Sequence, residues 1–560
     1  MFRTQKPWVR VYEGHASPEI EVHEGSLMDL FRAAVQEHRD EMALTFYGAT
    51  LDFVRLEALS ERMAASLTAS GVKKGDRVAL MLPNCPHYVI SFFAVVRLGA
   101  IVTQVNPTYV EREILHILDD SGAETIIAYS DGYTRIKNLT GKTALKNIVV
   151  VDLTGEPEDL EDGHAGFDEF VSRDVPRVPL AEIDPAEDVA VLQYTGGTTG
   201  VSKGAMLTHR NLVANVQQAL DLFVSDPADF SDNQAIMGIL PMFHIFGLTC
   251  VMLFGLRQGL NQILVPRFDP AEVTDLVREH RPVMFSGVPT MYMALVASGV
   301  DLKGYGFDGV RVFNSGGAAL PVNLKHAFEE KVGNSLYEGY GLSEASPVTH
   351  FNPPFSGEAR EGSIGVPVPG TDARIVDVET GSEEMPVGES GELVIRGPQV
   401  MKGYWNMPEE TAEALRDGWL RTGDVARMDE DGYFYIVDRK KDMILASGYN
   451  VYPREIEEIL FEHEEVAEAV AIGIPDEYRG ETVKAFVVRK KESGVTEKEV
   501  LAFCKARLAP YKTPKTVEFR EDLPKSAVGK LLRRVLADEE KAKSTQKTAP
   551  GGVSDTPSPS

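Results

Sequence analysis

A segment rich in glycine and threonine, YTGGTTGVSKGAMLTH at residues 194–209, constrains this chain more than any other sequence feature. It follows the apolar run VAVLQ and precedes a stretch with helical periodicity, so we expect it to follow a strand directly. Glycine lets backbone N–H groups approach an anion, threonine adds hydroxyl donors, and lysine supplies positive charge. The segment therefore predicts a phosphate-binding loop. Its candidate ligands are Thr195, Gly196, Gly197, Thr198, Thr199, Gly200 and Lys203.

The spacing within this segment differs from that of a Walker A loop, in which the lysine follows the last glycine directly and precedes Ser or Thr. Here Val201 and Ser202 separate Gly200 from Lys203, and Gly204 follows. A kinase or ATPase that releases ADP is therefore disfavoured, because the other kinase motifs are missing as well. A plain surface loop is the other interpretation, and the length of the pattern with its terminal lysine argues against it.

The charge of the chain limits its partners. Fifty-seven Lys and Arg residues against 84 Asp and Glu residues give a net charge of −27. A surface this acidic repels a phosphate backbone, so we expect no nucleic acid partner. An anionic substrate such as a nucleotide must then be met by a few placed cations or by a metal ion.

Cysteine content and hydropathy bear on location. Three distant cysteines, Cys85, Cys250 and Cys504, are a poor disulfide framework and favour a reducing compartment. The N-terminus lacks the apolar core of a secretory signal, and the most apolar stretch, residues 88–102, is interrupted by Arg97 and too short to span a bilayer. We therefore expect a cytoplasmic protein. Peripheral association with the inner face of the membrane stays open.

Periodicity predicts an α/β fold. From residue 76 short β-branched runs alternate with helical segments, which implies parallel sheets covered by helices. After residue 365 the short runs separated by glycine-containing turns predict a β-rich subdomain. Residues beyond 438 predict a small α+β domain of about a hundred residues. The segment 541–560, rich in Ser, Thr, Pro and Gly, predicts disorder.

Further motifs appear along nearly the whole chain in a fixed order, and the ordered set is far more specific than any single motif. They are PMFHIFG (241–247), NSGGAALP (314–321), YEGYGLSEASP (337–347), GELVIRGPQVMKGYW (391–405), GWLRTGD (418–424), DRKKDMI (438–444), SGYNVYPREIE (447–457) and LPKSAVGK (523–530). Together with the loop at 194–209 they resemble the adenylate-forming superfamily, and within it the bacterial long-chain fatty-acid CoA ligases.

The resemblance implies a reaction and a domain plan. A carboxylate attacks the α-phosphate of ATP with release of pyrophosphate, and the acyl group then passes from AMP to the thiol of CoA. ATP, magnesium and CoA are the implied cofactor and co-substrates, and a fatty acid is the implied substrate. The implied parts are an N-terminal adenylation domain (1–437), a hinge (438–444), a mobile C-terminal domain (445–540) and the tail (541–560).

The resemblance also assigns roles around the phosphates. The threonine-rich loop and Lys203 would hold the β- and γ-phosphates, and Glu344 with the Thr195 hydroxyl would hold magnesium, a hard cation that prefers oxygen ligands. Without its motif, Glu344 would as readily be a capping or surface carboxylate. Ser343 stands where relatives usually have threonine, and it keeps the hydroxyl.

A second set would bind the nucleoside. Small residues and an aromatic face suit a flat base, and a carboxylate suits ribose hydroxyls. Asp424 is the implied ribose ligand, with an ordinary Asx turn as the alternative. The implied adenine pocket comprises Gly317, Glu338, Gly339 and Tyr340, although a lone tyrosine is more often core packing.

The C-terminal motifs imply a domain that swings between the two half-reactions. Lys530 would serve the first, and Gly448, Tyr449 and Asn450 would line the pantetheine path of the second. Lys441 occupies the implied hinge position, and Arg439 beside it would contact the nucleotide. A solvated basic turn is the other interpretation of this run of charges.

The acid substrate is the least constrained element. The motif PMFHIFG offers no carboxylate for an amino-acid ammonium group, so an apolar lining for an alkyl chain is expected. His244 either lies near the substrate carboxylate or is a satisfied core residue. A ligase for aryl or short-chain acids remains the alternative, and a noncatalytic binding protein is disfavoured because the motif residues are all present. The sequence leaves the oligomeric state open, a homodimer included.

Overall fold

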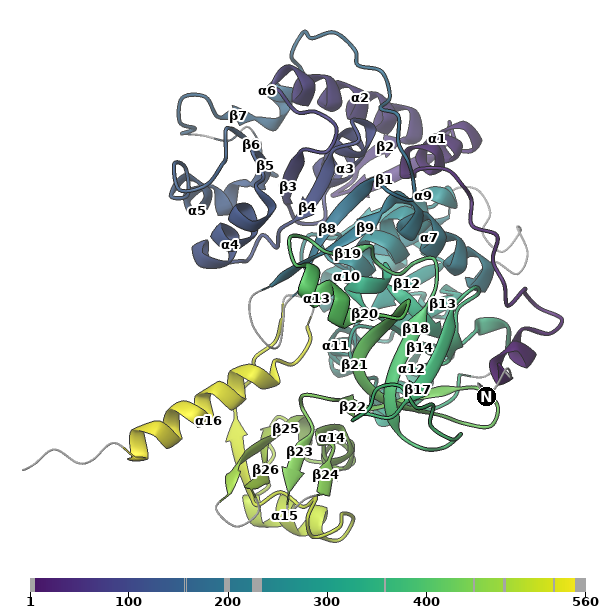
Figure 1. Cartoon of the computed structure of the whole chain (residues 1–560), viewed down its shortest axis with the longest axis vertical. Helices are drawn as coiled ribbons and strands as arrows, with labels where there is room; N and C mark the ends of the chain where they lie inside the picture. Colours follow the sequence, from purple (N-terminus) through teal and green to yellow (C-terminus); the bar gives the residue numbers. More distant parts are fainter. Residues whose placement is uncertain are drawn as a thin grey trace, which may run out of the picture. The chain divides into compact units, whose positions relative to one another are not determined.

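Residues Met1–Ile436, together with Ala527–Gly529, form one unit of the structure, and residues Val437–Ser526 and Lys530–Ser560 form a second. This computed structural model describes residues 6–155, 157, 159–195, 202–223, 234–356, 359–446, 449–476, 480–526 and 529–548. The elements are labelled in Figure 1.

The first sheet of the first unit has nine strands within the described residues. Their order is β16 (Val366–Pro367), β15 (Val348–Phe351), β14 (Leu336–Gly341), β13 (Val312–Ser315), β12 (Met284–Gly287), β10 (Ala235–Gly238), β11 (Asn261–Leu264), β1 (Met42–Phe46) and β2 (Ala49–Asp52). The strands from β14 to β1 pair in parallel, and β2, β15 and β16 add antiparallel edges. The apolar runs of these central strands are buried, as the parallel prediction requires.

The second sheet has eight described strands. Their order is β19 (Gly403–Tyr404), β9 (Lys203–Thr208), β8 (Val189–Thr195), β4 (Ile101–Gln104), β3 (Arg77–Met81), β5 (Thr125–Tyr129), β6 (Asn147–Val151) and β7 (Ala165–Gly166). The pairs from β8 to β7 are parallel, whereas β9 runs antiparallel to both β8 and β19. This reversal places Thr195 and Lys203 of the glycine-rich segment side by side.

Helices cover these sheets, and the apolar stretch at 88–102 belongs to the core. It forms α3 (Pro86–Arg97) and the start of β4; Phe93 of α3 stacks on Phe31 with ring centroids 3.9 Å apart. In the part of the chain that is described, no helix is both long and apolar enough to cross a membrane. The other helices of this unit are α1 (Leu27–Glu37), α2 (Phe53–Ala69), α4 (Glu111–Ser121), α5 (Tyr133–Lys137), α6 (Phe167–Val171), α7 (His209–Phe223), α8 (Ile245–Gly247), α9 (Phe254–Arg257), α10 (Pro270–His280), α11 (Pro289–Ala297), α12 (Val322–Val332) and α13 (Pro408–Ala414).

The predicted β-rich subdomain is a third, antiparallel sheet. Its strands are β17 (Asp372–Val376), β18 (Gly391–Arg396), β21 (Trp419–Met428) and β20 (Leu415–Arg416), with β22 (Phe434–Arg439) paired to β21. A tight turn joins β21 to β22, and Gly432 in that turn has φ +90°. Its missing side chain matters, because a Cβ there would lie 2.3 Å from the backbone nitrogen of Trp8.

The second unit is a small α+β domain. Its sheet contains β24 (Tyr449–Val451), β23 (Ile444–Ala446), β26 (Gly480–Arg489), β25 (Val466–Asp476) and β27 (Thr516–Arg520), and its helices are α14 (Pro453–Phe461), α15 (Glu497–Lys505) and α16 (Arg533–Thr548). The α/β class, the β-rich subdomain and the small C-terminal α+β domain predicted from the sequence are thus confirmed.

One boundary differs from the prediction. Disorder was predicted for 541–560, yet α16 continues to Thr548. The physical reason is local, because the run ADEEKAKSTQK contains several good helix formers and opposite charges three residues apart. Lys543 contacts Glu540 at 2.7 Å within the helix and Glu518 of β27 at 3.2 Å.

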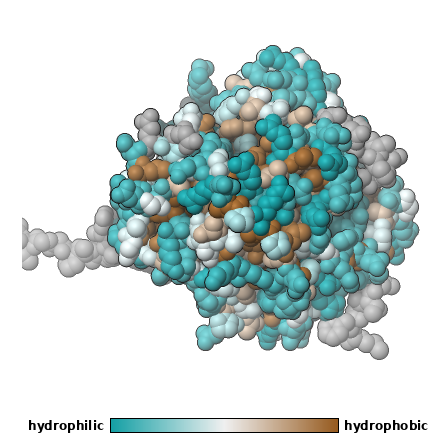
Figure 2. Space-filling view, turned by 90° about the horizontal axis from the view of Figure 1, so that it is seen from above, coloured by the Kyte–Doolittle hydropathy of each residue, from teal (hydrophilic) through white to brown (hydrophobic). Residues whose placement is uncertain are grey.

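The surface is mostly hydrophilic on the face seen in Figure 2, where hydrophobic residues are interrupted by charged and polar ones. The exposed large hydrophobic side chains of the described residues belong to separate elements; Tyr47, in the turn between β1 and β2, is the most exposed at 69%. Scattered apolar side chains of this kind are normal for a protein surface. Peripheral membrane association therefore stays a prediction.

Candidate active site

The ends of the glycine-rich segment meet in the hairpin of β8 and β9. Thr195, the last residue of β8, is directly opposite Lys203, the first of β9, and its hydroxyl donates to the Lys203 carbonyl at 3.5 Å. Ser202 donates from Oγ to the Thr195 carbonyl at 2.5 Å. The hairpin therefore sets a threonine hydroxyl and a lysine at one end of the sheet. The predicted ligands between them, Gly196, Gly197, Thr198, Thr199 and Gly200, lie outside the described residues and stay a prediction.

The base of this hairpin is fixed by α4 and by the segment around β19. The Tyr194 hydroxyl donates to Asp120 Oδ2 at 2.6 Å, and Trp405 donates from Nε1 to the Asp120 carbonyl at 3.2 Å. The Trp405 amide also donates to the Gly204 carbonyl at 2.8 Å. Burial and the Asp120 carboxylate raise the pKa of Tyr194 far above its usual value, so its hydroxyl remains a donor. These contacts hold the loop entrance on both sides.

Tyr404 of β19 joins Glu344 to Lys203. Its hydroxyl donates to Glu344 Oε1 at 2.8 Å, and Lys203 Nζ lies 5.1 Å from the centroid of its ring. Burial, and then the Glu344 carboxylate, raise the pKa of Tyr404 well above its usual value, which keeps the phenol protonated. The structure thus gathers Thr195, Lys203, Glu344 and Tyr404 around the hairpin.

Glu344 is also held through its backbone. It lies in the single turn η6 (Ser343–Ala345), and its carbonyl accepts the Met401 amide at 2.8 Å. Just beyond, the Ser346 hydroxyl donates to the Gln399 carbonyl at 2.9 Å, and Val348 exchanges hydrogen bonds with the side chain of buried Asn215. A buried polar network that is fully paired defines one position for the chain, so Glu344 projects from a rigid support.

Tyr340 and Asp424 form a second contact, between β14 and β21. The Tyr340 hydroxyl donates to Asp424 Oδ2 at 2.5 Å, and Asp424 is only 3% exposed. Behind Tyr340 the ring of His350 lies 6.0 Å away, edge to face. Burial lowers the pKa of His350 to about 3, so the imidazole is neutral near pH 7. Tyr340, which is predicted to face the base, and Asp424, which is predicted to bind the ribose, are therefore neighbours.

The remaining adenine-pocket candidates lie at the carboxyl ends of the parallel strands β13 and β14, where ligands of α/β sheets commonly bind. Gly317 has φ +76°, a conformation that favours glycine, and a Cβ on Gly339 would lie 2.6 Å from the Phe351 ring. Glu338 is almost fully buried, and its Oε1 accepts the Leu320 amide at 3.1 Å. Glu338 therefore shapes the loop after β13.

His244 caps the short helix α8, because its Nδ1 accepts the Phe246 amide at 3.3 Å. Phe246 in turn lies against the backbone of Gly316, since a Cβ on Gly316 would be 3.0 Å from its ring. Nδ1 of His244 is used in this capping contact, and the imidazole is half-buried. Its predicted position near the substrate carboxylate therefore stays a prediction, as does the alternative of a satisfied core residue.

Sequence reasoning gave no role to Asn84 and Tyr404. Asn84 donates to the Leu240 carbonyl and accepts the Met242 amide, both at 2.8 Å, so it scaffolds the loop that carries His244. The sequence feature that could have indicated this role is a polar residue in LPNCP, a turn between a strand and a helix. Tyr404 stood within the quoted MKGYW motif, whose aromatic residues were left unassigned.

The other candidates belong to the second unit. The Lys530 amide donates to Ser526 Oγ at 3.1 Å, Arg439 ends β22, and Lys441 lies in the turn that follows it. Gly448 lies outside the described residues, as do the side chains of Tyr449 and Asn450. Their roles stay predictions.

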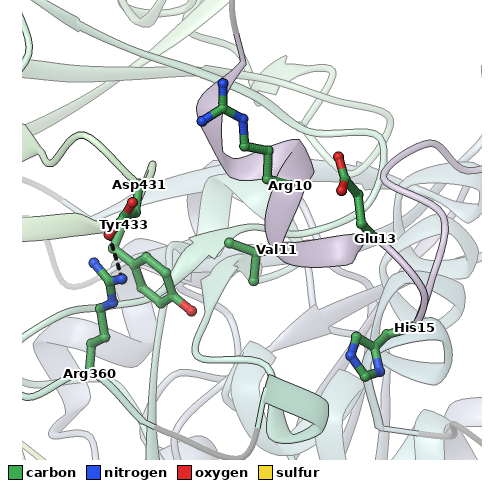
Figure 3. Close-up of a pocket in the computed structure, with 7 residues that line it drawn as sticks. All are labelled: Arg10, Val11, Glu13, His15, Arg360, Asp431 and Tyr433. Atoms are coloured by element: carbon green, nitrogen blue, oxygen red, sulfur yellow. Dashed lines mark hydrogen bonds and ion pairs between the residues drawn. The ribbon is translucent and has the colours of Figure 1, made fainter.

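A separate surface pocket of about 390 Å³ lies in the first unit, between the N-terminal turn η1 (Pro7–Tyr12) and the turn joining β21 to β22 (Figure 3). Its Arg360 contacts Asp429 at 2.8 Å and Asp431 at 2.6 Å, and lies 4.0 Å from the centroid of the Tyr433 ring. Because two carboxylates neutralise this cation, the pocket is better explained as the anchorage of the N-terminal segment. None of the predicted site residues lines it.

The AMP-binding enzyme family matches residues 31–405, and the AMP-binding enzyme C-terminal domain matches residues 455–530. A long-chain-fatty-acid–CoA ligase of Bacillus subtilis (strain 168) is 44% identical over 558 residues, covering 96% of this chain and 99% of the relative.

Two solved structures are similar over most of the chain. ATP-bound MatB from Rhodopseudomonas palustris has a TM-score of 0.83 and 32% identity, and covers 92% of this chain and 99% of its own. The anthranilate CoA ligase AuaEII, in complex with anthranoyl-AMP, has a TM-score of 0.85 and 27% identity, and covers 94% and 99%.

Proposed function

Because this chain belongs to the AMP-binding enzyme family, we propose that it is an AMP-forming ligase that joins a long-chain fatty acid to CoA with ATP. The observation that carries the proposal is the contact of Tyr404 with both Glu344 and Lys203 beside the β8–β9 hairpin. It sets a carboxylate and a cation together where the glycine-rich segment begins and ends. The name of the 44% identical relative supports the fatty acid as substrate.

The proposed reaction has two steps. A carboxylate oxygen of the fatty acid bonds to the α-phosphorus of ATP, and the bond from that phosphorus to the bridging oxygen breaks, releasing pyrophosphate. The CoA sulfur, having lost its proton, then bonds to the acyl carbon, and the carbon–oxygen bond to AMP breaks. Both steps concentrate negative charge, so the site must supply positive charge where it develops.

We propose that Lys203 contacts the phosphates of ATP, and that Glu344 with the Thr195 hydroxyl binds magnesium. The residues fit that ion, because Mg²⁺ in nucleotide sites usually takes one or two carboxylates and completes its shell with phosphate oxygens and water. Among the described residues, no group of three or more His, Cys, Asp or Glu side chains could hold a metal ion by itself, without the phosphates of a nucleotide. When bound, the ion would neutralise phosphate charge.

We further propose that Tyr340 faces the adenine and that Asp424 accepts hydrogen bonds from the ribose hydroxyls. Asp424 is suited to this role, because a carboxylate accepts hydrogen bonds from hydroxyl groups and the hydroxyl of Tyr340 already donates to it at 2.5 Å. Lys530 would act in the first step. Residues 438–444 would form the hinge, with Arg439 near the nucleotide and Gly448, Tyr449 and Asn450 along the pantetheine path.

The second candidate is a ligase for aromatic acids. The similarity to a ligase complexed with anthranoyl-AMP favours it, as does the aromatic Phe246 beside Gly316. The higher identity to a relative named for long-chain fatty acids favours the first candidate. The three cysteines are buried and free, which supports the predicted cytoplasmic location.

Nucleotide product analysis tests the proposal. The enzyme is incubated with ATP, magnesium and single acids from a panel of long-chain, short-chain and aromatic acids, each with and without CoA. We expect AMP and pyrophosphate, with the highest rates for long chains in the presence of CoA. AMP formation with aromatic acids alone would select the second candidate, and ADP would overturn the mechanism.

A further inference from the structure

Arg533 is the centre of an ionic cluster in the second unit. Its Nε and Nη2 contact the two carboxylate oxygens of Glu457 in α14 at 3.1 and 2.5 Å. Its Nη1 contacts Asp438 at 3.4 Å and Asp442 at 3.3 Å. One guanidinium thus connects three carboxylates from two separate segments of this unit, the 438–442 segment and α14.

The acidic partners are themselves fixed. The side chain of Asp438 is 1% exposed, and its two oxygens accept the Arg439 and Arg454 amides at 2.7 Å each. Glu457 Oε1 accepts the Ala471 amide of β25 at 2.8 Å. Such a network holds its members in one geometry, because each buried charge would be left unpaired if the network opened.

Lys530 is joined to this cluster by a short ordered stretch of backbone. The Ser526 amide donates to the Lys530 carbonyl, and the Leu532 amide to the Pro524 carbonyl, each at 2.8 Å. Arg533 follows as the first residue of α16. Only Leu531 and Leu532 therefore separate the proposed adenylation lysine from the arginine that contacts the proposed hinge.

We propose that Arg533 is a positioning residue that joins Lys530 to two carboxylates of the hinge segment, Asp438 and Asp442, so that Lys530 keeps a fixed orientation relative to this segment when the domain rotates. This inference rests on the proposed function. The fork geometry of a guanidinium is essential to it, because a single ammonium cannot contact both oxygens of Glu457 and also reach Asp438.

The variant Arg533→Lys tests the idea, because it keeps the charge that the buried carboxylates need. A hydrophobic cluster of Leu536 with Val470, Ile472, Phe486 and Leu523 also anchors α16, which favours folding of the variant. The matched control is Arg520→Lys. Arg520 contacts Glu539 of α16 and Glu518 of β27 at 2.7 Å each, and neither partner belongs to the hinge segment.

Three readouts are measured on each protein. Acyl-adenylate formation from ATP and fatty acid should fall about tenfold to a hundredfold in Arg533→Lys, as expected for a misplaced reacting group. Transfer of the acyl group from supplied acyl-adenylate to CoA should fall about threefold or less, because Lys530 acts in the first step. Hydrogen exchange of the backbone at 438–444 should become faster in Arg533→Lys. The control Arg520→Lys should match the parent protein in both half-reactions and in hydrogen exchange.

A double-mutant cycle separates positioning from general damage. If Arg533 acts through Lys530, adding Arg533→Lys to Lys530→Ala should change acyl-adenylate formation by less than about twofold. Equal losses in both half-reactions, or additive losses in the cycle, would overturn the inference. So would loss of adenylation in Arg533→Lys when Lys530→Ala itself is fully active.

Failure of the proposed function is distinguishable. In that case the parent protein would form no AMP or pyrophosphate with any acid. The hydrogen-exchange comparison needs no substrate and would then decide alone. Unchanged exchange at 438–444 in Arg533→Lys would refute the role of Arg533 in holding this segment, and faster exchange there would support it.

Discussion

Replacing Tyr404 with phenylalanine perturbs one hydrogen bond at the proposed phosphate site and keeps the aromatic ring. The bond to Glu344 Oε1, 2.8 Å long, joins a hydroxyl to a charged group. Bonds of that kind contribute about 1.5–3 kcal/mol, and both side chains are only half-buried, so the lower end applies. About 1.5 kcal/mol corresponds to roughly a tenfold change. The ring contact with Lys203 is retained.

The assay for Tyr404→Phe is kcat/KM for ATP at saturating acid and CoA, together with calorimetric titration of magnesium–ATP onto the enzyme. We expect about a tenfold fall in kcat/KM and weaker nucleotide binding, because Glu344 loses its fixed orientation. Tyr404→Leu also removes the ring under Lys203, which should cost about 0.5–2 kcal/mol more.

Tyr435→Phe is the matched control, because Tyr435 donates to Asp429 at 2.9 Å in the same unit and outside the proposed site. It should lower thermal stability slightly and leave nucleotide binding unchanged. If Tyr404→Phe binds and turns over ATP like the parent protein, or loses only as much as Tyr435→Phe, the phenol does not orient Glu344 for catalysis.

Three further predictions concern other parts of the site. Asp424→Asn should raise KM for ATP about tenfold, because a neutral amide forms weaker hydrogen bonds to ribose hydroxyls, and an unchanged KM contradicts that role. Burial holds the pKa of His350 at about 3, whereas an unfolded histidine titrates near 6.5, so only the unfolded chain gains this proton between those values. Stability should therefore fall below about pH 6.5, by about 2 kcal/mol at pH 5, and the melting temperatures of the parent and His350→Gln should converge on acidification; parallel curves refute the assignment. Gly448→Leu should block acyl transfer to CoA and spare acyl-adenylate formation, and normal acyl-CoA production would show that the pantetheine path lies elsewhere.

The parts of the fold that sequence predicted are those governed by local pattern. Continuous apolar runs such as VAVLQ gave buried parallel strands, because both faces of such a strand are covered. The helical continuation of residues 541–548 was missed, since composition averaged over 541–560 concealed a charged run with good helix propensity at its start. Composition describes a segment as a whole, whereas a helix depends on successive residues.

The site itself shows a different limit. Thr195 and Lys203 could be associated from sequence, because they belong to one continuous motif. The contact of Tyr404 with Glu344 could not, because the two residues belong to separate motifs that meet through tertiary contacts, among them the pairing of β19 with β9. Sheet register between distant segments is set by tertiary packing, so no local pattern specifies it.

The reversal of β9 explains why these residues gather. A parallel β9 would carry Lys203 to the opposite end of the sheet from Thr195, whereas the antiparallel hairpin sets them in register. The free edge of β9 then pairs with β19, which brings Tyr404 opposite Ala205. From the same segment, the Met401 amide bonds to the Glu344 carbonyl and draws the end of β14 toward the hairpin. One antiparallel strand at the edge of a parallel sheet therefore assembles side chains from three distant motifs at a single point.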